Sequence, residues 1–572
     1  MFDFRLAVAE IIVNQTELEI NEISTLIEIP PKEDMGDYAF PCFRLAKELK
    51  KNPAQIAAEF SEKINSEVPQ WLERTEAVGP YLNFYLNRGY YASQVLKTVI
   101  TESDDFGKSQ IGQQRNVIVE YSSPNIAKPF HVGHAYTTIL GQVIGNIYDA
   151  LGFNTIRMNH LGDYGTQFGK LIIAWRLWGD DTALAKEPIT ELTRVYVKFH
   201  SLLEEQPELE DQAREAFKRL EDKEPAEVEL WQKFRDCSLL EFNRLYERLG
   251  ISFDNFNGES FYSDLIPEVV KMLEDKGLLH ESRGAQVVDL EEFDLNPCII
   301  LKSDGTTIYA SRDIAAILYR DRTYDFYKNI YVVGLPQTNH FQQVFAVLKK
   351  AGFAKADQNI HIGFGSVKFK DGDFSTRKGN IILLEDLLDQ SVAKTKEIIV
   401  KNNPEMSQAE VEQTAETVGL AAVKYTYLKN GREHDIMFDW DEILDFEGDT
   451  APYLMYTYAR AKSILQKADF AGNNLNNSDF YLLTEDDEFG LIKNMYQYPE
   501  VLIQAAEEFE PSILLRKISQ LARNFNRFYH NTPILKTENI ALRHARLALV
   551  FAVSIVLKNG LILAGINPVE RM

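Results

Sequence analysis

The chain has 572 residues, of which 45% are hydrophobic, and its 61 basic and 85 acidic side chains give a formal net charge of −24. This composition excludes a disordered or collagen-like chain and supplies enough apolar residues for several cores, so we expect roughly three or four domain-sized units. The acidic balance argues against indiscriminate binding to nucleic acid, although it is compatible with a local basic groove.

The sequence also argues against a membrane or secreted protein. The longest apolar run, residues 547–557, falls short of the ~20 residues that a bilayer crossing requires. The N-terminal segment lacks the pattern of a signal peptide, so we expect a cytoplasmic protein. Its three cysteines lie far apart without a metal-binding spacing, and we therefore predict no disulfide framework and no protein-bound metal.

Up to about residue 110 the sequence mixes helical patterns with one β-like segment. Helices are predicted for residues 2–15 and 44–64, and a strand is predicted for residues 81–86, where Tyr, Phe and Leu recur. We interpret residues 1–110 as a small α+β domain. The polar, glycine-containing stretch 102–115 has the composition of a linker.

From residue 116 onward, short apolar runs alternate with helical patterns. Strands are predicted at 117–121, 155–160, 298–301, 329–334 and 359–364, and helices at 132–151 and 166–177. Alternation of this kind predicts parallel βαβ units, so we expect residues 111–445 to form a Rossmann-like parallel-sheet catalytic domain. A helical insertion is predicted at about 182–250. An open parallel sheet binds ligands at the carboxyl ends of its strands.

Beyond residue 445 nearly every pattern is helical, including residues 453–468, 511–529 and 542–563. We therefore expect residues 446–572 to form an all-α helix bundle. The complete chain is predicted to be a multidomain α/β protein.

The densest chemical signal lies where strand 117–121 runs through a loop into a helix that begins near His131. His131 and His134 share one face of the first helical turn, and Gly133 between them allows a phosphate to approach the backbone. Helix starts favour anions, so both imidazoles could donate hydrogen bonds to an α-phosphate during an in-line displacement, with Lys128 adding positive charge. An isolated HxxH sequence is more often a pair of surface or capping histidines in an ordinary βα loop, but the strand before it and the helix after it shift the preference toward phosphate binding.

A second signal is the stretch FGSVKFKDGDFSTRKGN, residues 364–380, which precedes a predicted helix at 383–400. Arg377 and Lys378 could reach the β- and γ-phosphates of a nucleotide, although a solvated basic turn has the same composition. Neither GxxxxGK[ST] nor GxGxxG occurs in the sequence. A bound nucleotide would therefore not be held by a P-loop or a dinucleotide fingerprint.

HxGH after a first strand, together with STRKG after a late strand, resembles the two signature motifs of class I aminoacyl-tRNA synthetases. The segments VEYSSPNIAKPFHVGH, NHLGDYGTQFGKL, TIYASRDIA and FSTRKGN resemble the arginyl-tRNA synthetase family in particular. GDYAFPCFRLAK, YTYARAKSIL and the final PVERM extend the resemblance over essentially the whole chain.

The resemblance implies an arginine–tRNA ligase. Such an enzyme activates L-arginine with ATP to arginyl-adenylate and transfers the arginyl group to the 2′-hydroxyl of the terminal adenosine of tRNA(Arg). It further implies Mg²⁺ with ATP, a monomer, and activation that depends on bound tRNA.

For ATP, the resemblance assigns binding and transition-state stabilisation to His131, Gly133 and His134. The second motif departs from the class pattern KMSKS, because the leading lysine is missing and Thr376 and Arg377 stand where Ser and Lys are expected. In the family such a loss is thought to be compensated by a lysine upstream of the first motif, which implies that Lys128 neutralises phosphate charge. The remaining predicted ATP and catalytic contacts are Ser375, Arg377 and Lys378.

For the amino acid, the resemblance implies that Glu120 and Asn125 hold the α-amino and α-carboxyl end. It places four residues around the side chain, namely Glu259, Tyr309, Asp313 and Gln337. The charges agree, because a guanidinium offers five fixed donors and a permanent positive charge and needs carboxylates and other oxygen acceptors. Without the surrounding motifs, a helix cap or a surface salt bridge would be the preferred explanation of Glu259 and Asp313.

For tRNA, Tyr81 and Asn83 match family positions that contact the D-loop, although a strand with one exposed face explains the same alternation. The aromatic and basic residues predicted to contact unstacked anticodon bases are Tyr456, Tyr458, Arg460 and Tyr529. Aromatic side chains suit single-stranded RNA, but most tyrosines on a helix bundle are simply packed.

Two other functions fit parts of the sequence. One is a different nucleotidyl-transferring enzyme that uses HxGH on a small molecule, which would have little use for separate terminal domains. The other is a catalytically silent tRNA-binding relative, which the two motifs disfavour.

Overall fold

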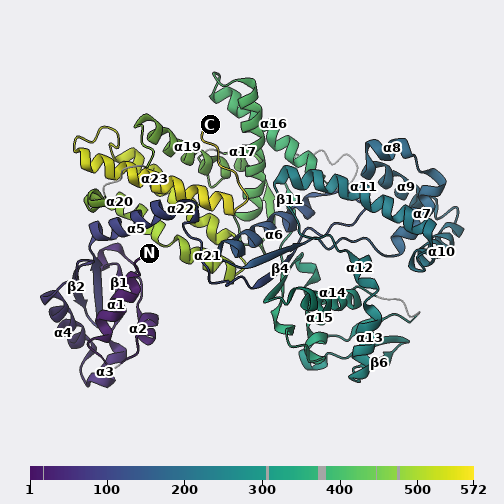
Figure 1. The fold of residues 1–572 in the computed structure, drawn as a ribbon, viewed down its shortest axis with the longest axis horizontal. Coiled ribbons are helices and arrows are strands. Elements are labelled where there is room, and N and C mark those ends of the chain that lie inside the picture. The colour runs from purple at the N-terminus through teal and green to yellow at the C-terminus, as the bar shows by residue number, and fades with distance from the viewer. Residues whose placement is uncertain (17, 304–307, 371–381, 446, 473–476, 572) are drawn as a thin grey trace.

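The computed structural model describes residues 1–572 except 17, 304–307, 371–381, 446, 473–476 and 572. Figure 1 shows a small N-terminal domain, a central region around β4 and a helical C-terminal region that lies between the other two. Ser375, Arg377 and Lys378 of the second predicted motif lie outside the described residues.

The N-terminal domain is α+β, as predicted. Strand β3 (Tyr81–Leu86) lies between β1 (Tyr38–Pro41) and β2 (Leu72–Val78) in an antiparallel sheet. Its helices are α1 (Phe4–Val13), α2 (Ile20–Leu26), α3 (Phe43–Leu49) and α4 (Pro53–Ser66). The helical pattern at 44–64 is thus two helices, because α3 ends at Lys50 in the left-handed conformation and Asn52 caps a new helix that begins with proline.

Helix α5 (Arg88–Glu102) leads out of this domain and packs against C-terminal helices. The central sheet then begins. Its four strands are parallel. Across the sheet they lie in the order β10 (Asn359–Ile362), β9 (Lys328–Val332), β4 (Asn116–Glu120) and β5 (Asn154–Met158).

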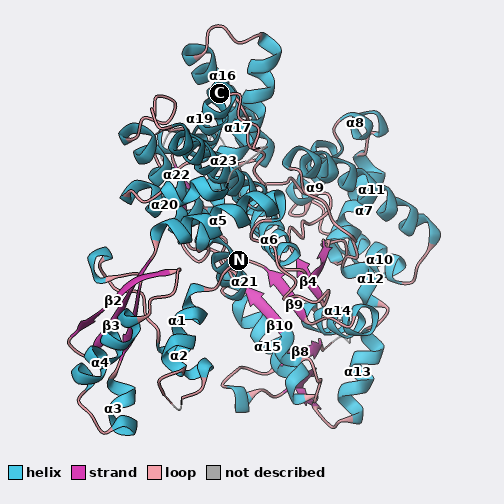
Figure 2. Ribbon diagram, turned by 60° about the vertical axis from the view of Figure 1, so that its left-hand side comes forward, coloured by secondary structure: helices cyan, strands magenta, loops and turns pink. Residues whose placement is uncertain are grey.

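The chain leaves β4 toward β5 on one side of the sheet and later adds β9 and β10 on the other. Helix α6 (Val132–Ala150) connects β4 with β5, and α15 (Thr338–Lys350) connects β9 with β10. Figure 2 shows β4, β9 and β10 in the middle of the central region, with α15 near β10. The strand order reverses between β4 and β9, which is where an open parallel sheet leaves room for a ligand.

The strand at 298–301 forms as predicted but belongs to another sheet. β8 (Cys298–Leu301) pairs antiparallel with β7 (Ala285–Val288), which forms a hairpin with β6 (Leu279–Ser282). Arg283 and Gly284 both have positive φ, so they close a two-residue turn between β6 and β7. A short apolar run reveals a strand but not its partner, and assigning this one to the parallel sheet was wrong.

Helices surround the parallel sheet. After α7 (Thr166–Trp178), the stretch predicted as a helical insertion contains α8 (Asp181–Lys186), α9 (Pro188–Leu202), α10 (Glu208–Glu221) and α11 (Pro225–Leu249). The following helices are α12 (Glu259–Ser263), α13 (Ile266–Asp275) and α14 (Tyr309–Tyr324). The last part of the region contains α16 (Leu384–Asn402), α17 (Gln408–Leu428), α18 (Trp440–Ile443) and the parallel pair β11 (Val367–Phe369) and β12 (Ile436–Phe438).

The C-terminal region is a helix bundle, as predicted. Its helices are α19 (Ala451–Lys467), α20 (Asp486–Tyr496), α21 (Tyr498–Glu507), α22 (Ser512–Asn531) and α23 (Ile540–Leu563). By length and composition α23 could cross a membrane, but 78% of its most apolar window is buried inside the protein. It therefore packs as the core helix of the bundle. Short 3₁₀ helices occur at Glu33–Met35, Ser103–Asp105, Glu291–Phe293, Leu335–Gln337, Ala356–Gln358 and Asn477–Leu482.

Candidate active site

The two predicted imidazoles form one structure at the start of α6. His131 is the N-cap residue, and its Nδ1 accepts the Gly133 N–H at 3.1 Å. Nδ1 of His134 accepts the His131 N–H at 3.2 Å, and the two rings stack with centroids 3.8 Å apart. A Cβ on Gly133 would lie 2.9 Å from Cε1 of His131, so a larger residue here would disturb the stack.

This capping fixes the chemical state of both rings. Because each Nδ1 accepts a backbone N–H, the proton of a neutral ring lies on Nε2, which remains available as a donor. Burial lowers the pKa of His131, and burial, His131 and Lys128 together lower the pKa of His134 to about 3. Both rings are therefore neutral hydrogen-bond donors near neutral pH.

The loop between β4 and α6 is held in a strained form. Ser122, Ser123 and Ala127 have positive φ without being glycine. The Ala127 N–H is bound by the Ser238 hydroxyl of α11 at 2.9 Å, which helps to hold the loop. Strain of this kind persists where the surrounding structure imposes it, and it is common at functional sites. Exposed Lys128 follows directly and is close enough to influence His134 electrostatically.

Residues 382–384, which directly follow the second predicted motif in the sequence, lie beside the first motif. The Val132 N–H donates to the Ile382 carbonyl at 3.1 Å, and the Leu384 N–H donates to the Phe130 carbonyl at 3.0 Å. His131 and Leu383 form an isolated antiparallel bridge between these bonds. The residues that directly follow the second motif in the sequence are thus joined to the start of α6.

Glu120 is the last residue of β4, and its neighbours across the sheet are Met158 and Tyr331. Its buried carboxylate pairs with the fully buried guanidinium of Arg320, which also binds Asn329 at 3.3 Å. Nδ1 of His160 lies 3.7 Å from Oε2 of Glu120. Glu120 therefore lies at the predicted edge of the sheet but already has an internal cationic partner.

Glu259 and Asp313 lie near each other and also have internal partners. Glu259 Oε2 accepts Arg312 Nη1 at 3.2 Å, whereas Asp313 Oδ2 lies 2.6 Å from Nε2 of His340. Burial raises the pKa of Glu259 to about 7, with Arg312 opposing the effect and Asp313 adding to it. Two carboxyl groups thus lie where a cationic side chain was predicted to bind, each with a partner from the chain itself.

The remaining predicted amino-acid contacts surround the same edge of the sheet. Asn125 forms an isolated parallel bridge with Gly162, and its Oδ1 fills the space that a Cβ of Gly162 would take. Exposed Gln337 ends the 3₁₀ turn after β9 and caps α15. Tyr309 begins α14 and is 61% exposed. Burial raises the pKa of Tyr331, and both Glu120 and Asp313 raise it further, so the two carboxylates approach the same tyrosine.

The internal partners of these carboxylates were not predicted from the sequence. The residues concerned are Arg312, Arg320, His340 and His160. A usable signal was present for Arg320, because TIYASRDIAAILYR places it seven residues after Asp313, beyond the apolar run Ala315 to Ile317. A charged residue on an apolar helix face indicates a buried partner. No such pattern marks His340.

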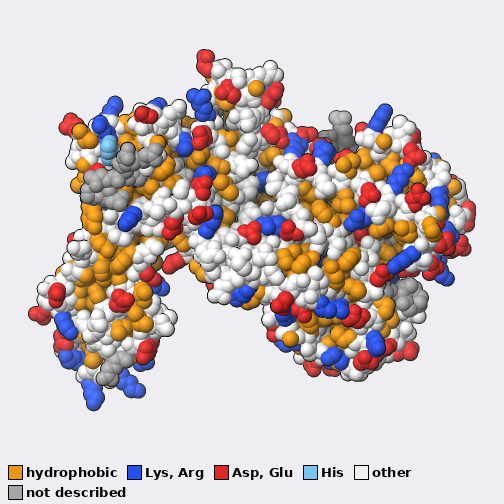
Figure 3. Space-filling view, in the orientation of Figure 1, with side chains coloured by type: hydrophobic (Ala, Val, Ile, Leu, Met, Phe, Trp, Pro, Cys, Tyr) orange, Lys and Arg blue, Asp and Glu red, His pale blue; other side chains and the backbone are white. Residues whose placement is uncertain are grey.

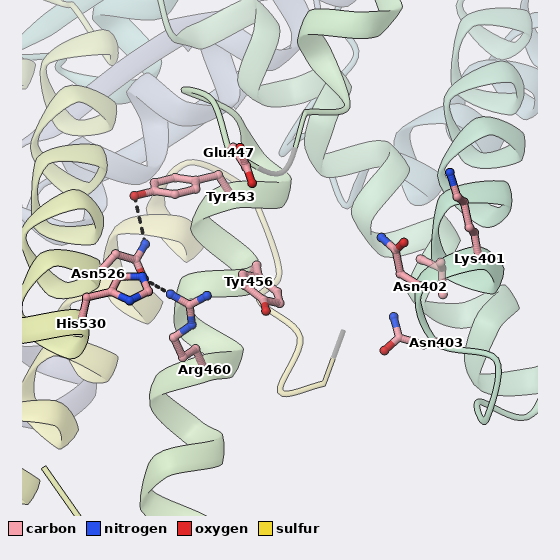
Figure 4. Close-up of a pocket in the computed structure, with 10 residues that line it drawn as sticks. Lys401, Asn402, Asn403, Glu447, Tyr453, Tyr456, Arg460, Asn526 and His530 are labelled. Carbon is pink, nitrogen blue, oxygen red and sulfur yellow. Dashed lines mark hydrogen bonds between the residues drawn. The ribbon is translucent and has the colours of Figure 1, made fainter. Parts of the chain in front are cut away.

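Two of the predicted RNA-binding residues of the C-terminal bundle, Tyr456 and Arg460, line the same cavity. Figure 4 shows Tyr456 and Arg460 on one wall of a cavity of about 760 Å³, facing the end of α16 with Lys401, Asn402 and Asn403. The Arg460 guanidinium lies 4.8 Å from the ring of Tyr456 and 5.1 Å from that of Tyr529. It also binds Asn526. Tyr458, by contrast, is 5% exposed and does not line this cavity.

In the N-terminal domain, Tyr81 is exposed and forms an edge-to-face pair with exposed Phe43 at 5.9 Å. Asn83, two residues along the same strand, is 1% exposed and faces the interior. Only Tyr81 of this predicted pair thus lies at the surface. Within the part of the chain that the structure describes, no group of three or more His, Cys, Asp or Glu residues could hold a metal ion.

Comparisons with known proteins cover nearly the whole chain. The model of the class I (R) tRNA synthetase catalytic domain matches residues 95–440. The model of the arginyl-tRNA synthetase N-terminal domain matches residues 3–86, and that of the DALR anticodon-binding domain matches residues 454–572.

Individual relatives agree with the family models. The arginine–tRNA ligase of Clostridium perfringens is 50% identical over 570 residues, and that of a Clostridium botulinum strain is 51% identical, each covering 100% of both chains. Among solved structures, the arginyl-tRNA synthetase of Thermus thermophilus has a TM-score of 0.79 at 27% identity and covers 96% of both chains. The Plasmodium falciparum enzyme has a TM-score of 0.77 at 26% identity, covering 96% of this chain and 94% of the other.

Proposed function

Since the chain belongs to the arginyl-tRNA synthetase family and is an arginine–tRNA ligase, we propose that it activates arginine at the carboxyl ends of β4 and β9 with the residue roles that follow. Its substrates are ATP, L-arginine and tRNA(Arg). The observation that carries the proposed site is the stacked, capped His131–His134 pair at the start of α6, the helix that follows the strand ending at Glu120.

In the first step, a carboxylate oxygen of arginine attacks the α-phosphorus of ATP and pyrophosphate leaves. Negative charge grows on the α-phosphate oxygens as the transition state forms. The Nε2–H groups of His131 and His134 donate to these oxygens, and neutral donors with fixed orientation need no rearrangement at that moment. Gly133 leaves space beside them, and the N-terminus of α6 adds its free backbone N–H groups.

The departing pyrophosphate requires positive charge. Lys128 lies before the histidine motif and provides it, and Ser375, Arg377 and Lys378 complete the contacts to the phosphates. The hydrogen bonds that join Ile382 and Leu384 to the start of α6 support this assignment, because they bring the residues that directly follow the second motif to the first motif. We further propose that Mg²⁺ enters with ATP, since Mg²⁺ in such sites is held largely by substrate phosphates and water.

The amino acid lies next to this phosphate site. Asn125 and Glu120 hold its α-amino and α-carboxyl end, while the side chain is surrounded by Glu259, Tyr309, Asp313 and Gln337. The two neighbouring carboxyl groups of Glu259 and Asp313 support the assignment, because a guanidinium is always protonated and needs oxygen acceptors. In the second step, the 2′-hydroxyl of the terminal adenosine attacks the activated carbonyl, and AMP leaves.

Contacts with tRNA involve both terminal regions, with residues 1–110 and 446–572 as RNA-binding domains around a catalytic domain at 111–445. Tyr81 stacks on a D-loop base, Tyr456 and Arg460 hold an anticodon base in the cavity of Figure 4, and Tyr529 supports Arg460 from beside it. Contacts by Asn83 and Tyr458 stay predictions. Figure 3 shows Lys and Arg side chains gathered at the α3 end of the N-terminal domain, where they fit an RNA backbone.

The assignment further includes a monomer in the cytoplasm whose arginine activation depends on bound tRNA. Pyrophosphate exchange, measured with each amino acid in the presence and absence of tRNA(Arg), tests it. Exchange with arginine that requires cognate tRNA is the expected result. Exchange supported by other acceptors would indicate a different nucleotidyl transferase, and no exchange at all would indicate a silent tRNA-binding relative.

A further inference from the structure

Arg312 lies where the substrate's side chain is expected. It precedes Asp313 on α14, and its Nη1 donates to Oε2 of Glu259 at 3.2 Å. The side chains of Arg312 and Glu259 are only 9% and 13% exposed. A carboxylate proposed to bind a guanidinium therefore binds one that belongs to the chain itself.

Two aromatic rings beside Arg312 make its surroundings similar to those expected for the guanidinium of a bound substrate. The guanidinium carbon of Arg312 lies 5.4 Å from the ring of Tyr164 and 5.4 Å from the ring of Tyr309. A planar cation between aromatic rings and a carboxylate is the arrangement that favours a guanidinium over an ammonium group. Glu259 and Tyr309 are two of the four residues that we assign to the substrate's side chain.

Two other arginines on the same helix differ from Arg312. Arg320 is fully buried, and it is bonded both to Glu120 and to Asn329, so its pairing is a permanent part of the core. Arg322 is half-exposed and pairs with Glu268 away from the site. Arg312 lies between these extremes, because it is packed against site residues but sits beside highly exposed Tyr309.

We propose that the guanidinium of Arg312 occupies the place of the substrate's side chain against Glu259 until L-arginine displaces it, and that Arg312 thereby sets the affinity of the site for cationic amino acids. The inference rests on the proposed function, which places the substrate at Glu259. An unpaired carboxylate in this partly buried position is costly, and Arg312 offsets that cost in the ligand-free enzyme. A ligand gains Glu259 only if it displaces this guanidinium, so the affinities for L-arginine and for L-lysine are both lower than the pocket alone would give.

Steady-state exchange with the full-length enzyme and saturating tRNA(Arg) tests the proposal. Arg312→Gln should lower the KM for L-arginine by roughly ten- to hundredfold, which corresponds to the value of the charged hydrogen bond between Arg312 and Glu259. L-lysine should inhibit this variant at lower concentrations than it inhibits the unaltered enzyme. Arg322→Gln, on the same helix, is the matched control and should change neither value. In a Glu259→Gln background, Arg312→Gln should have no further effect on KM.

The outcomes separate this inference from the assignment of the site. If Glu259→Gln raises the KM but Arg312→Gln leaves it unchanged or raises it, the site stands and the inference fails. If Glu259→Gln leaves the KM unchanged, the substrate does not reach Glu259 and both fail. A crystal structure of the unaltered enzyme with L-arginine is independent of any variant's folding. It should show the substrate on Glu259 and Arg312 turned away, whereas an intact Arg312–Glu259 pair beside bound arginine overturns the inference.

Discussion

Nε2 of His340 lies 2.6 Å from Oδ2 of Asp313, which joins the first turn of α15 to α14 across the edge of the parallel sheet. Burial lowers the pKa of His340, but its hydrogen bond and attraction to Asp313 outweigh burial, so the pKa is raised overall. The carboxylate assigned to the substrate's guanidinium is thus held in place by a group whose own charge depends on pH.

Asp313→Asn should weaken arginine binding without affecting ATP. The substitution keeps the volume of the side chain but removes its negative charge, and a hydrogen bond to a charged group contributes about 1.5–3 kcal/mol. We therefore expect the KM for arginine to rise roughly ten- to hundredfold in pyrophosphate exchange, with an unchanged KM for ATP. Asp321→Asn is the control, because Asp321 lies on the same helix and pairs with Lys355. Normal arginine saturation in Asp313→Asn would place the pocket elsewhere.

The KM for arginine should fall as the pH rises above 6.5. Protonated His340 neutralises Asp313, and the raised pKa of His340 places the loss of that proton above its ordinary value of 6.5. The neighbouring imidazole of His361 has a lowered pKa and stays neutral in this range. His340→Asn should flatten this part of the pH profile, whereas His280→Asn, at an exposed position of β6, should not. A profile identical to that of the unaltered enzyme would remove His340 from this role.

The pairing of His340 with Asp313 also predicts how the stability of the protein depends on pH. A histidine with a raised pKa in the folded state stabilises the protein fully below its ordinary pKa and loses this contribution as the pH rises through the raised value. The Tm of the unaltered enzyme should therefore fall more steeply above pH 6.5 than that of His340→Asn. Parallel Tm profiles of the two proteins would contradict this linkage.

Titration of Glu259 should have its own effect on arginine binding and on stability, separate from that of His340. Its pKa is raised to about 7, mainly by burial, so its carboxyl is largely protonated at pH 6 and largely ionised at pH 8. Replacing it with glutamine should therefore raise the KM for arginine more at pH 8 than at pH 6. The stabilising contribution of a carboxyl with a raised pKa is lost as the pH rises through 7, so Glu259→Gln should gain Tm relative to the unaltered enzyme above that pH. Equal KM ratios at both pH values would show that Glu259 does not titrate in this range.

Some features of the site follow from local sequence patterns, whereas others depend on contacts between residues that lie far apart in the sequence. The strand that ends at Glu120 and the cap at His131 were predictable, because a β-like run followed by a helix start is a local pattern. The Arg320–Glu120 pair joins residues 200 positions apart, and the Asp313–His340 bond crosses between two helices. Such contacts depend on the packing of the whole sheet. The same reason accounts for the strand at 298–301, whose partner is selected by the hairpin beside it.

Lys128→Ala should slow adenylate formation while arginine affinity stays nearly normal. Lys128 is exposed and close enough to lower the pKa of His134, so its charge acts on the phosphate side of the site. Single-turnover formation of arginyl-adenylate in the presence of tRNA(Arg) measures the step directly. Lys108→Ala removes an exposed lysine that pairs with Asp105 and should leave the rate unchanged. An unchanged rate in Lys128→Ala would refute the proposed neutralisation of phosphate charge.

Tyr456 should contribute to tRNA affinity through its ring. It is 40% exposed beside the cavity of Figure 4, and its contact with Arg460 leaves an aromatic surface that a base can stack on. Stacking of one base on an aromatic side chain contributes about 1–3 kcal/mol, so Tyr456→Ala should raise the KM for tRNA at least fivefold, roughly the lower end of that range. The kcat at saturating tRNA should stay unchanged, because the cavity is formed by the bundle and the end of α16. Tyr456→Phe keeps the ring and is the matched control, with a KM close to that of the unaltered enzyme. If the alanine and phenylalanine variants have equal KM values, the ring does not stack on tRNA and the cavity serves another purpose.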